Sequence, residues 1–392
     1  METLKPELAE FQNLKDLKQM LASEGPCLSV FMQLSSAPNN QSVKANALQW
    51  RELIRALEGS TKQLGAKGRE LLDSIADWDA VSPNSEPKGK SVAVFRSPDL
   101  FHIGWVEEPV PSRAIVGPHF YIRPLLPELT RDKTFYILAL SQKDVRLLRC
   151  TRQTSEEVDF PASTVANFEA FMNSVKPDHV SERGAATGPA SGSNKGVTTG
   201  TTAVRENRDN KDEYLANFFR QIDRGVNECL KGKTDPVVPV GVEYEIALYR
   251  SVNKYQHLAP ESVEGAPNSL KSGEMHSRAI DAMLRCYEHK IDEALAEYDH
   301  KVGGGASNRL KDVVTAAHEG RVLTLLVSDS LETTGKFDES TYTVTGRETG
   351  TREDEDLVND AVVQTILHAG QVYVASNGKM PNGAPLAAIY RF

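Results

Sequence analysis

The stretch FYILALSQKDVRLLRCT, residues 135–151, decides how this chain of 392 residues folds. Its two apolar runs, FYILALS and VRLLRCT, are separated by a short polar segment, which is typical of two strands joined by a tight turn. Because side chains alternate along a strand, Arg146 and Arg149 are expected on opposite faces of the sheet. The stretch therefore predicts a β-hairpin that opens a folded unit.

Strands and helices follow one another on both sides of this hairpin. The apolar patterns predict strands at residues 27–34, 91–95, 100–106, 236–242, 321–327, 341–345, 371–375 and 385–392. They predict helices at residues 6–22, 43–78, 168–175, 274–300 and 353–368, and another that begins near residue 212. In the helix at 43–78, Leu48 and Leu64 are expected on the buried side. The order favours an α/β protein of mixed α+β type with three domains, at residues 1–124, 125–245 and 246–392.

A change of composition marks the middle of the second domain. From Met172 to Glu213 the chain has no Phe, Tyr or Trp, and glycine recurs at every fourth position among Ser, Thr, Ala and Asn. These glycines are Gly184, Gly188, Gly192, Gly196 and Gly200. Such a segment buries too little apolar surface to offset its conformational entropy, so residues 183–210 are predicted to form a mobile functional loop.

The balance of charge limits the ways in which this chain binds nucleic acid. It has 45 Lys and Arg against 54 Asp and Glu, a net charge of -9, which argues against binding through bulk positive charge. Basic residues nevertheless gather between residues 130 and 152, where six stand against two acidic ones. The candidate RNA-binding residues are Arg131, Lys143, Arg146 and Arg149 near the hairpin, and Arg183, Lys195, Arg205 and Arg208 in the loop. A strand edge protected by solvated charge is the alternative interpretation.

Several classes of site find no support in the sequence. The four cysteines form no CxxC pair and the histidines have no ligand spacing, so we expect no metal, no cofactor and no disulfide framework. KGKS at 88–91 and KGKT at 231–234 lack the first glycine of a phosphate-binding loop and are interpreted as solvated turns. The acidic run EDED at 353–356 fits the start of a helix better than a metal site. No apolar run reaches membrane-spanning length and no signal peptide is recognisable, so we expect a cytoplasmic protein without a membrane or DNA partner.

Two segments near the end of the sequence resemble a known domain. AAHEGRVLTLLVSDS at 316–330 and VNDAVVQTILHAGQVYVASNGKMPNGAPLAAIYRF at 358–392 resemble the third domain of archaeal and eukaryotic class 1 peptide chain release factors and of Pelota. Residues 120–161 and 218–230 resemble the bacterial archaeo-eukaryotic release factor family. The resemblance implies a central RNase H-like domain and a C-terminal α/β sandwich similar to kink-turn-binding ribosomal proteins.

The resemblance also implies a function in translation. The middle domain of release factors presents a Gly-Gly-Gln loop, but residues 183–210 contain no Gly-Gly pair, and no glutamine occurs between Gln153 and Gln221. Peptidyl-tRNA hydrolysis needs a group that positions water at the ester. We therefore expect a ribosome-associated factor that binds tRNA or rRNA, acts in ribosome rescue or translation surveillance as Pelota does, and is not an enzyme.

Two other functions remain open. One is a peptidyl-tRNA or ester hydrolase whose catalytic group differs from the family glutamine, with His179 or His318 as a conceivable base. The other is a protein-binding module without RNA, because residues 306–392 carry eight basic against twelve acidic residues and favour a protein partner there.

Overall fold

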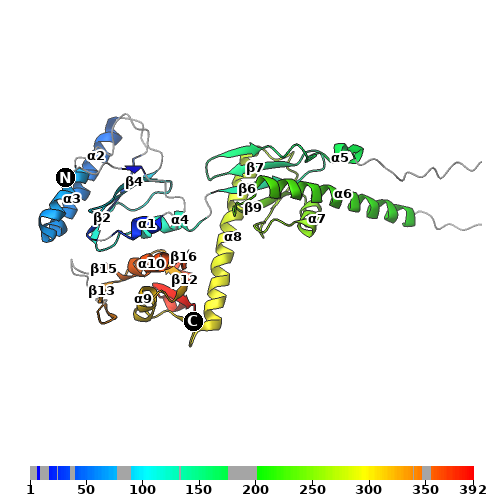
Figure 1. The fold of residues 1–392 in the computed structure, drawn as a ribbon. Helices are drawn as coiled ribbons and strands as arrows, with labels where there is room; N and C mark the ends of the chain where they lie inside the picture. The colour runs from blue at the N-terminus through cyan, green and yellow to red at the C-terminus, as the bar shows by residue number, and fades with distance from the viewer. Residues whose placement is uncertain are drawn as a thin grey trace, which may run out of the picture. The chain divides into compact units, whose positions relative to one another are not determined.

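The computed structural model contains two compact units (Figure 1). Unit 1 comprises Met1–Lys133 and Glu288–Phe392, and unit 2 comprises Thr134–Tyr287. The structure describes residues 7–8, 17–23, 25–35, 40–76, 90–131, 134–174, 201–338, 340–346 and 355–392. The mixed α/β class with several sheets is confirmed. The three domain borders and the RNase H-like and sandwich assignments stay predictions.

The N-terminal part of unit 1 is built on a five-stranded sheet of order β1-β4-β3-β2-β5. Its strands are β1 (Glu7–Leu8), β2 (Cys27–Gln33), β3 (Ser91–Arg96), β4 (Phe101–Val106) and β5 (Arg113–Gly117). β1 pairs with β4 in parallel, whereas β2, β3, β4 and β5 pair antiparallel. The predicted strand at 27–34 and the predicted hairpin of 91–95 with 100–106 are confirmed.

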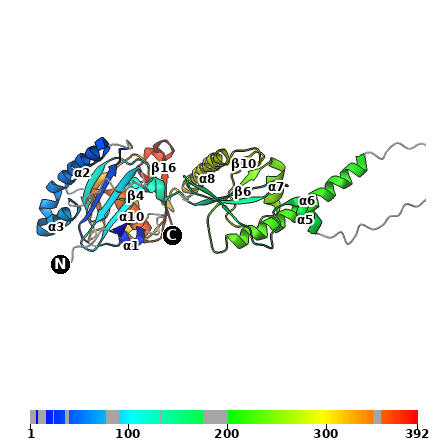
Figure 2. The same cartoon turned by 90° about the horizontal axis from the view of Figure 1, so that it is seen from above.

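Two helices cover one face of this sheet. They are α2 (Asn40–Thr61) and α3 (Gly65–Ala76), joined by the 3₁₀ turn η1 (Lys62–Leu64), and they lie along the same side of the strands in Figure 2. Their packing confirms one apolar side, but the expected inward positions of Leu48 and Leu64 are wrong, because these side chains are 57% and 37% exposed. The helix predicted at 6–22 is wrong at its start, where β1 forms, and is helical over α1 (Leu17–Leu21).

The C-terminal part of unit 1 carries two smaller sheets. One has the order β11-β17-β12-β16 and the other the order β14-β13-β15. Their strands are β11 (Ala306–Ser307), β12 (Val322–Ser328), β13 (Thr334–Asp338), β14 (Thr343–Gly346), β15 (Glu355–Asp356), β16 (Gln371–Ala375) and β17 (Leu386–Tyr390). The helices are α9 (Leu310–His318) and α10 (Leu357–Leu367), with short 3₁₀ turns η3 (Asn377–Lys379) and η4 (Pro381–Gly383). The strands predicted at 321–327, 371–375 and 385–392 are confirmed.

Helix α10 is buried around its whole circumference. The carboxylate of Asp356, the last residue of the acidic run, accepts a hydrogen bond from the backbone N–H of Val358 at 3.1 Å and caps the helix. The helix predicted at 353–368 begins later, at Leu357, because Glu355 and Asp356 form β15, while Glu353 and Asp354 lie outside the described residues. A helix whose side chains are buried on every side belongs inside a core rather than on a surface. Its position therefore tells where the centre of unit 1 lies.

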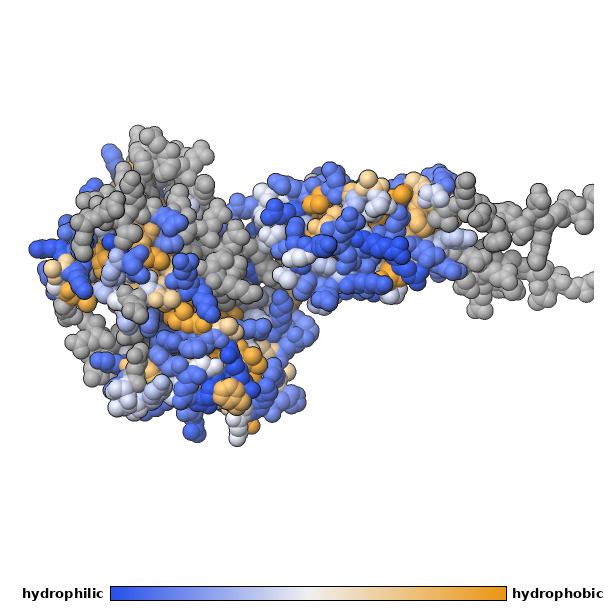
Figure 3. Space-filling view, viewed as in Figure 1, coloured by the Kyte–Doolittle hydropathy of each residue, from blue (hydrophilic) through white to orange (hydrophobic). Residues whose placement is uncertain are grey.

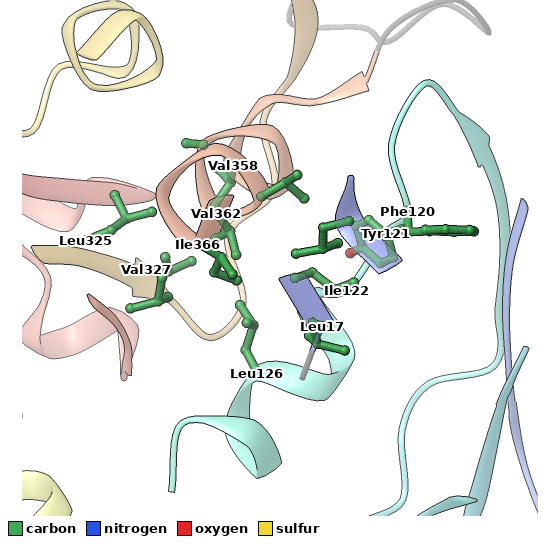
Figure 4. Packing of buried hydrophobic residues seen from close by; sticks show 14 of the residues in the cluster. Leu17, Phe120, Tyr121, Ile122, Leu126, Leu325, Val327, Val358, Val362 and Ile366 are labelled. Atoms are coloured by element: carbon green, nitrogen blue, oxygen red, sulfur yellow. The ribbon is translucent and has the colours of Figure 1, made fainter. Parts of the chain in front are cut away.

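The N-terminal and C-terminal parts of unit 1 share one hydrophobic core (Figure 4). Phe120, Ile122 and Leu126 pack in the same cluster as Val358 and Val362 of α10. Leu126 belongs to α4 (Leu126–Leu129), which follows the 3₁₀ turn η2 (Arg123–Leu125). Because both segments lose apolar surface to the same core, they stabilise each other despite their separation in sequence.

Unit 2 is a five-stranded sheet with helices on both faces. Its order is β10-β9-β6-β7-β8, with β6 (Phe135–Ala139), β7 (Arg146–Cys150), β8 (Ser155–Val158), β9 (Val237–Gly241) and β10 (Val263–Glu264). Its helices are α5 (Phe168–Ser174), α6 (Thr201–Cys229), α7 (Glu243–Val252) and α8 (Ser272–Lys301), the last of which continues into unit 1. Helices α5, α6 and α7 pack on one face of the sheet, and the first half of α8 packs on the other.

The hairpin that opens unit 2 is confirmed. β6 and β7 pair antiparallel with Leu138 opposite Leu147, and β9 adds to β6 in parallel. The strand predicted at 236–242 and the helices predicted at 168–175 and 274–300 are also confirmed. Helix α6 begins at Thr201 rather than near residue 212, so the part of the predicted loop from 201 to 210 is helical.

Candidate nucleic-acid interface

The parallel strands of unit 2 end together at one edge of the sheet. β6 and β9 are parallel neighbours in the sheet. After β6 the chain continues to β7, on one side of this pair, and after β9 it continues to β10, on the other side of the pair. In open α/β sheets, ligands bind outside the carboxyl ends of strands at such a reversal of direction. This edge is therefore the first place in unit 2 to search for a functional site.

Four polar side chains meet at this edge, and we call them the strand-end cluster: Ser141, Gln142, Glu245 and Asn268. The amide Nε2 of Gln142 donates to Oε1 of Glu245 at 3.1 Å, and Nδ2 of Asn268 donates to Oγ of Ser141 at 3.1 Å. Ser141 and Gln142 follow β6, Glu245 follows β9 and Asn268 follows β10. The three parallel strands therefore bring together residues that lie far apart in the sequence.

Glu245 is the buried acid of the strand-end cluster. It is 7% exposed, and burial raises the pKa of its carboxyl group, which the hydrogen bond from Gln142 partly offsets. Burial disfavours the charged form of a carboxyl group, whereas a donated hydrogen bond favours it. The carboxyl group is thus poised to hold a proton more readily than an exposed glutamate.

The turn after β6 is fixed to the start of α5. The carbonyl of Gln142 accepts from the N–H of Phe168 at 2.9 Å, and the N–H of Val145 donates to the carbonyl of Ala166 at 2.8 Å. Nδ2 of Asn167 also donates to the carbonyl of Lys143. These bonds hold Lys143 in an exposed turn beside the segment that leads into α5.

Helix α6 reaches the same edge at Asp212. Helix α6 precedes β9 and runs against its direction, and Figure 1 shows it passing beyond the end of the sheet. Tyr244, which follows β9, lies beside Asp212 of α6, and desolvation together with the hydrogen bond to Asp212 raises the pKa of Tyr244 to about 12. Tyr244 and Tyr214 remain 47% and 43% exposed. Tyr244 therefore provides an accessible aromatic ring next to Glu245 of the strand-end cluster, and Tyr214 is an accessible ring on α6. The face of unit 2 that Figure 3 shows is mostly hydrophilic, with scattered hydrophobic residues.

The predicted basic residues near the hairpin are not gathered into one patch. Lys143 is exposed in the turn, and Arg146 lies 3.7 Å from the carboxylate of Asp144. Arg149 is on the opposite face of β7 from Arg146, as alternation requires, and pairs across the sheet with Tyr136.

Arg131 lies in unit 1 rather than with the hairpin. Its guanidinium pairs with the carboxylate of Glu108 at 3.4 Å. Of the four candidates near the hairpin, Lys143 therefore stands at the strand-end edge as an exposed cation.

The predicted loop residues fall largely outside the described part of the chain. These are Arg183, Lys195, Gly184, Gly188, Gly192, Gly196 and Gly200. Arg205 and Arg208 lie in α6 instead of a loop, so their expected loop position is wrong.

Sequence reasoning missed the strand-end cluster. The signal was present, since Ser141 ends the predicted strand at 135–141 and Glu245 stands three residues after the predicted strand at 236–242. What the sequence did not reveal is that these two strands are parallel neighbours, which alone puts their carboxyl ends together.

The sequence also suggested two histidines, His179 and His318, as catalytic bases. Nε2 of His318 lies 2.8 Å from the carboxylate of Asp360, and its ring stacks on Phe337, so it is a buried side chain rather than an open base. His179 lies outside the described residues.

Where the structure is described, no group of three His, Cys, Asp or Glu side chains is placed to hold a metal ion. No helix in that part of the chain is long and apolar enough to cross a membrane.

Comparison with known proteins bears on this same unit. Residues 134–321 match the model of bacterial archaeo-eukaryotic release factor family 3. The family resemblance stated from the sequence is thereby confirmed, and the matched segment contains all of unit 2. No curated protein matches the sequence.

Solved structures of release factors and Pelota proteins are similar to this chain over most of its length. The archaeal translation termination factor aRF1 is 16% identical, with 98% of this chain and 99% of that chain covered and a TM-score of 0.23. A ribosome-bound archaeal Pelota is 13% identical, with 98% and 95% covered and a TM-score of 0.39. Dom34 of S. cerevisiae, a translation termination-like factor, is 10% identical, with 97% and 94% covered and a TM-score of 0.35.

Proposed function

We propose that this protein is a ribosome-associated, RNA-binding factor of the cytoplasm that acts in ribosome rescue or translation surveillance without hydrolysing peptidyl-tRNA. The observation that carries the proposal is the family match over residues 134–321, in a chain that has no glutamine between Gln153 and Gln221. A release factor without its water-positioning group keeps the capacity to bind but loses the hydrolytic step. The archaeal Pelota among the similar structures is ribosome-bound.

The strand-end edge of unit 2 supports contact with RNA. Lys143 supplies a solvated positive charge of the kind that pairs with phosphate, and Tyr244, next to Glu245, supplies an exposed ring on which a base stacks. Tyr214 on α6 is a second exposed ring. The net charge of -9 leaves such local contacts, rather than overall attraction, as the source of affinity.

Sedimentation with ribosomes at low and high salt tests this proposal. We expect co-sedimentation that weakens as salt rises, because phosphate contacts release counterions. Lys143→Glu should reduce it several-fold, whereas Lys231→Glu, an exposed lysine in the turn after α6, should leave it unchanged. Absence of salt-sensitive co-sedimentation would overturn ribosome association, and equal losses for the two variants would remove the strand-end edge from the interface.

A second candidate function rests on Glu245. A buried carboxyl group with a raised pKa, at the carboxyl ends of parallel strands, is an arrangement used by general bases in hydrolases. Incubation with peptidyl-tRNA separates the two functions. Release of peptide by the native protein that Glu245→Gln abolishes would establish a hydrolase, and unchanged substrate would eliminate it.

A protein partner at the acidic C-terminal part of unit 1 is the third possibility that the experiment must separate. Residues 306–392 carry eight basic and twelve acidic residues. A complex recovered from lysate that survives nuclease treatment would favour a protein partner, whereas one that nuclease dissolves supports the RNA-binding proposal.

A further inference from the structure

A hollow of about 910 Å³ opens in the C-terminal part of unit 1. It lies between the end of α8, the start of α9 and the strands β14 and β17. Its volume falls within the range of roughly 300–1,000 Å³ that is common for small-molecule sites. None of the residues discussed for the strand-end edge lines this hollow, so the hollow is a separate candidate site.

Three tyrosines supply the aromatic part of the hollow. Tyr298 of α8 is buried, Tyr390 of β17 is partly buried, and Tyr342 is half-exposed at the turn before β14. The ring of Tyr342 meets the ring of Phe337 edge to face at 5.9 Å between centroids, which holds it in place. Exposed rings at the wall of a hollow provide flat faces on which a planar ligand stacks.

The charged residues of the hollow are mainly basic. Arg309, Lys311 and Arg321 line it against one acidic residue, Asp312. The guanidinium of Arg321 donates to Glu319 at 2.5 Å and lies over the ring of Tyr390, 5.5 Å from its centroid. Arg309 and Lys311 are exposed and form no ion pair with any described residue. The hollow is therefore locally positive although the surrounding segment is acidic.

Polar groups without strong partners complete the lining. The hydroxyl of Tyr390 is enclosed and has no hydrogen-bond partner at ordinary distance among the described residues, although the nearby Ser307 hydroxyl lowers its pKa against the larger effect of burial. Arg309, at the start of α9, provides no side-chain cap for that helix. Enclosed polar atoms usually find a partner, so a ligand with acceptor oxygens would satisfy them.

We propose that this hollow binds a nucleotide, with its base against Tyr342 and its phosphates against Arg309 and Lys311. Planar aromatic rings and unpaired cations that line one hollow match the two halves of such a ligand, and neither half alone uses both. A hollow of this size accommodates one free nucleoside phosphate. The same chemistry is offered by one nucleotide of an RNA strand, and the experiment distinguishes these sources.

Calorimetric titration of the full chain tests the proposal with five probes. They are ATP, AMP, adenosine, inorganic tripolyphosphate and a single-stranded RNA of ten nucleotides. We expect ATP to bind more tightly than AMP, and both to bind more tightly than adenosine or tripolyphosphate, because the site recognises ring and phosphate together. RNA that binds while ATP and AMP do not would overturn the assignment of a free nucleotide.

Two variants connect the binding to the hollow. Arg309→Glu with Lys311→Glu should weaken ATP binding on the order of tenfold or more, since two attractive charges become repulsive. The matched control is Arg69→Glu with Lys67→Glu, the same two residue types at the same spacing on the exposed side of α3, and it should bind as the native protein does.

The second variant removes the ring without straining the backbone. Tyr342 has a φ of 52°, a region that asparagine tolerates, so Tyr342→Asn is the suitable change. It should weaken ATP and AMP binding about fivefold or more and leave tripolyphosphate binding unchanged. No detectable ATP binding at millimolar concentration, or equal binding in native and both variant proteins, would refute the proposal.

Discussion

Arg123 and Asp356 form a buried ion pair although 233 positions separate them in the chain. Their side chains are 7% and 9% exposed, and the guanidinium nitrogen lies 2.7 Å from the carboxylate oxygen. The same guanidinium donates to the carbonyls of Ser328 and Leu331 at 3.1 and 2.7 Å. The pair therefore joins η2, which follows the N-terminal sheet of unit 1 in the chain, to the residue that caps α10.

Removing Arg123 should destabilise unit 1 severely. Arg123→Met leaves the Asp356 carboxylate buried and uncompensated, and the expected loss is about 3–5 kcal/mol in the free energy of unfolding. Arg113→Met is the matched control, because its partner Glu332 is well exposed, and it should lose about 1 kcal/mol or less. Urea unfolding of both variants measures the difference, and equal small losses would contradict the importance of the buried pair.

Glu245 should make the stability of unit 2 depend on pH. Burial raises the pKa of its carboxyl group above the ordinary value of 4.5, so the folded protein holds this proton more tightly than the unfolded chain. The contribution of Glu245 to stability therefore falls as pH rises from about 4.5 through the raised pKa, and is constant above it. Glu245→Gln should gain stability relative to the native protein across this window.

The control for this titration is the neighbouring Glu243, which is exposed on the same helix. Glu243→Gln should follow the native protein at every pH, as measured by urea midpoints between pH 4 and pH 8. A native protein and a Glu245→Gln variant whose midpoints run parallel would show that the carboxyl group is not perturbed.

Replacing Gly225 of α6 with alanine should lower the stability of the protein, whereas the same replacement at Gly273 of α8 should raise it. A Cβ atom at Gly225 would lie 2.6 Å from Oγ1 of Thr164 and 3.1 Å from the ring of Phe160, while one at Gly273 meets nothing within 4 Å. Gly225→Ala should therefore destabilise by about 1–3 kcal/mol, as overpacking does. Gly273→Ala should stabilise by about 0.4–1 kcal/mol by restricting the unfolded chain. Thermal unfolding decides between opposite signs, and two shifts of the same sign would be inconsistent with this packing.

The thiols should differ sharply in reactivity. Burial raises the pKa of Cys27 to about 12 and that of Cys150 to about 11, and both side chains are inaccessible. Cys229 is partly accessible, so it should be the first thiol to react with iodoacetamide in the native protein at pH 8. Mass spectrometry of tryptic peptides measures the order of labelling. Rapid native labelling of Cys27 would show that the N-terminal sheet opens readily.

Local sequence patterns predicted the individual strands and helices better than they predicted which of these elements contact one another. The hairpin at 135–151 and the strand at 236–242 were recognisable because each is a short apolar run between polar residues. Their parallel contact, and with it the meeting of Ser141 and Glu245, depends on packing between segments that no local pattern records.

The shared core of unit 1 was hidden for the same reason. Ile122 and Val362 are ordinary apolar residues of two distant segments, and only the fold brings them together. The prediction that Leu48 is buried was wrong because α2 buries a narrower side than the positions of its leucines suggest.

The order of segments in the chain has a consequence for biosynthesis. All of unit 2 emerges from the ribosome between the two parts of unit 1, so it has every strand it needs once residue 287 has left the ribosome. The N-terminal sheet is made first, yet the face that packs on α10 stays uncovered until residues 357–367 follow. During that interval the nascent chain exposes an apolar surface of the kind that chaperones bind. The first part of the protein to be synthesised is thus among the last to be completed.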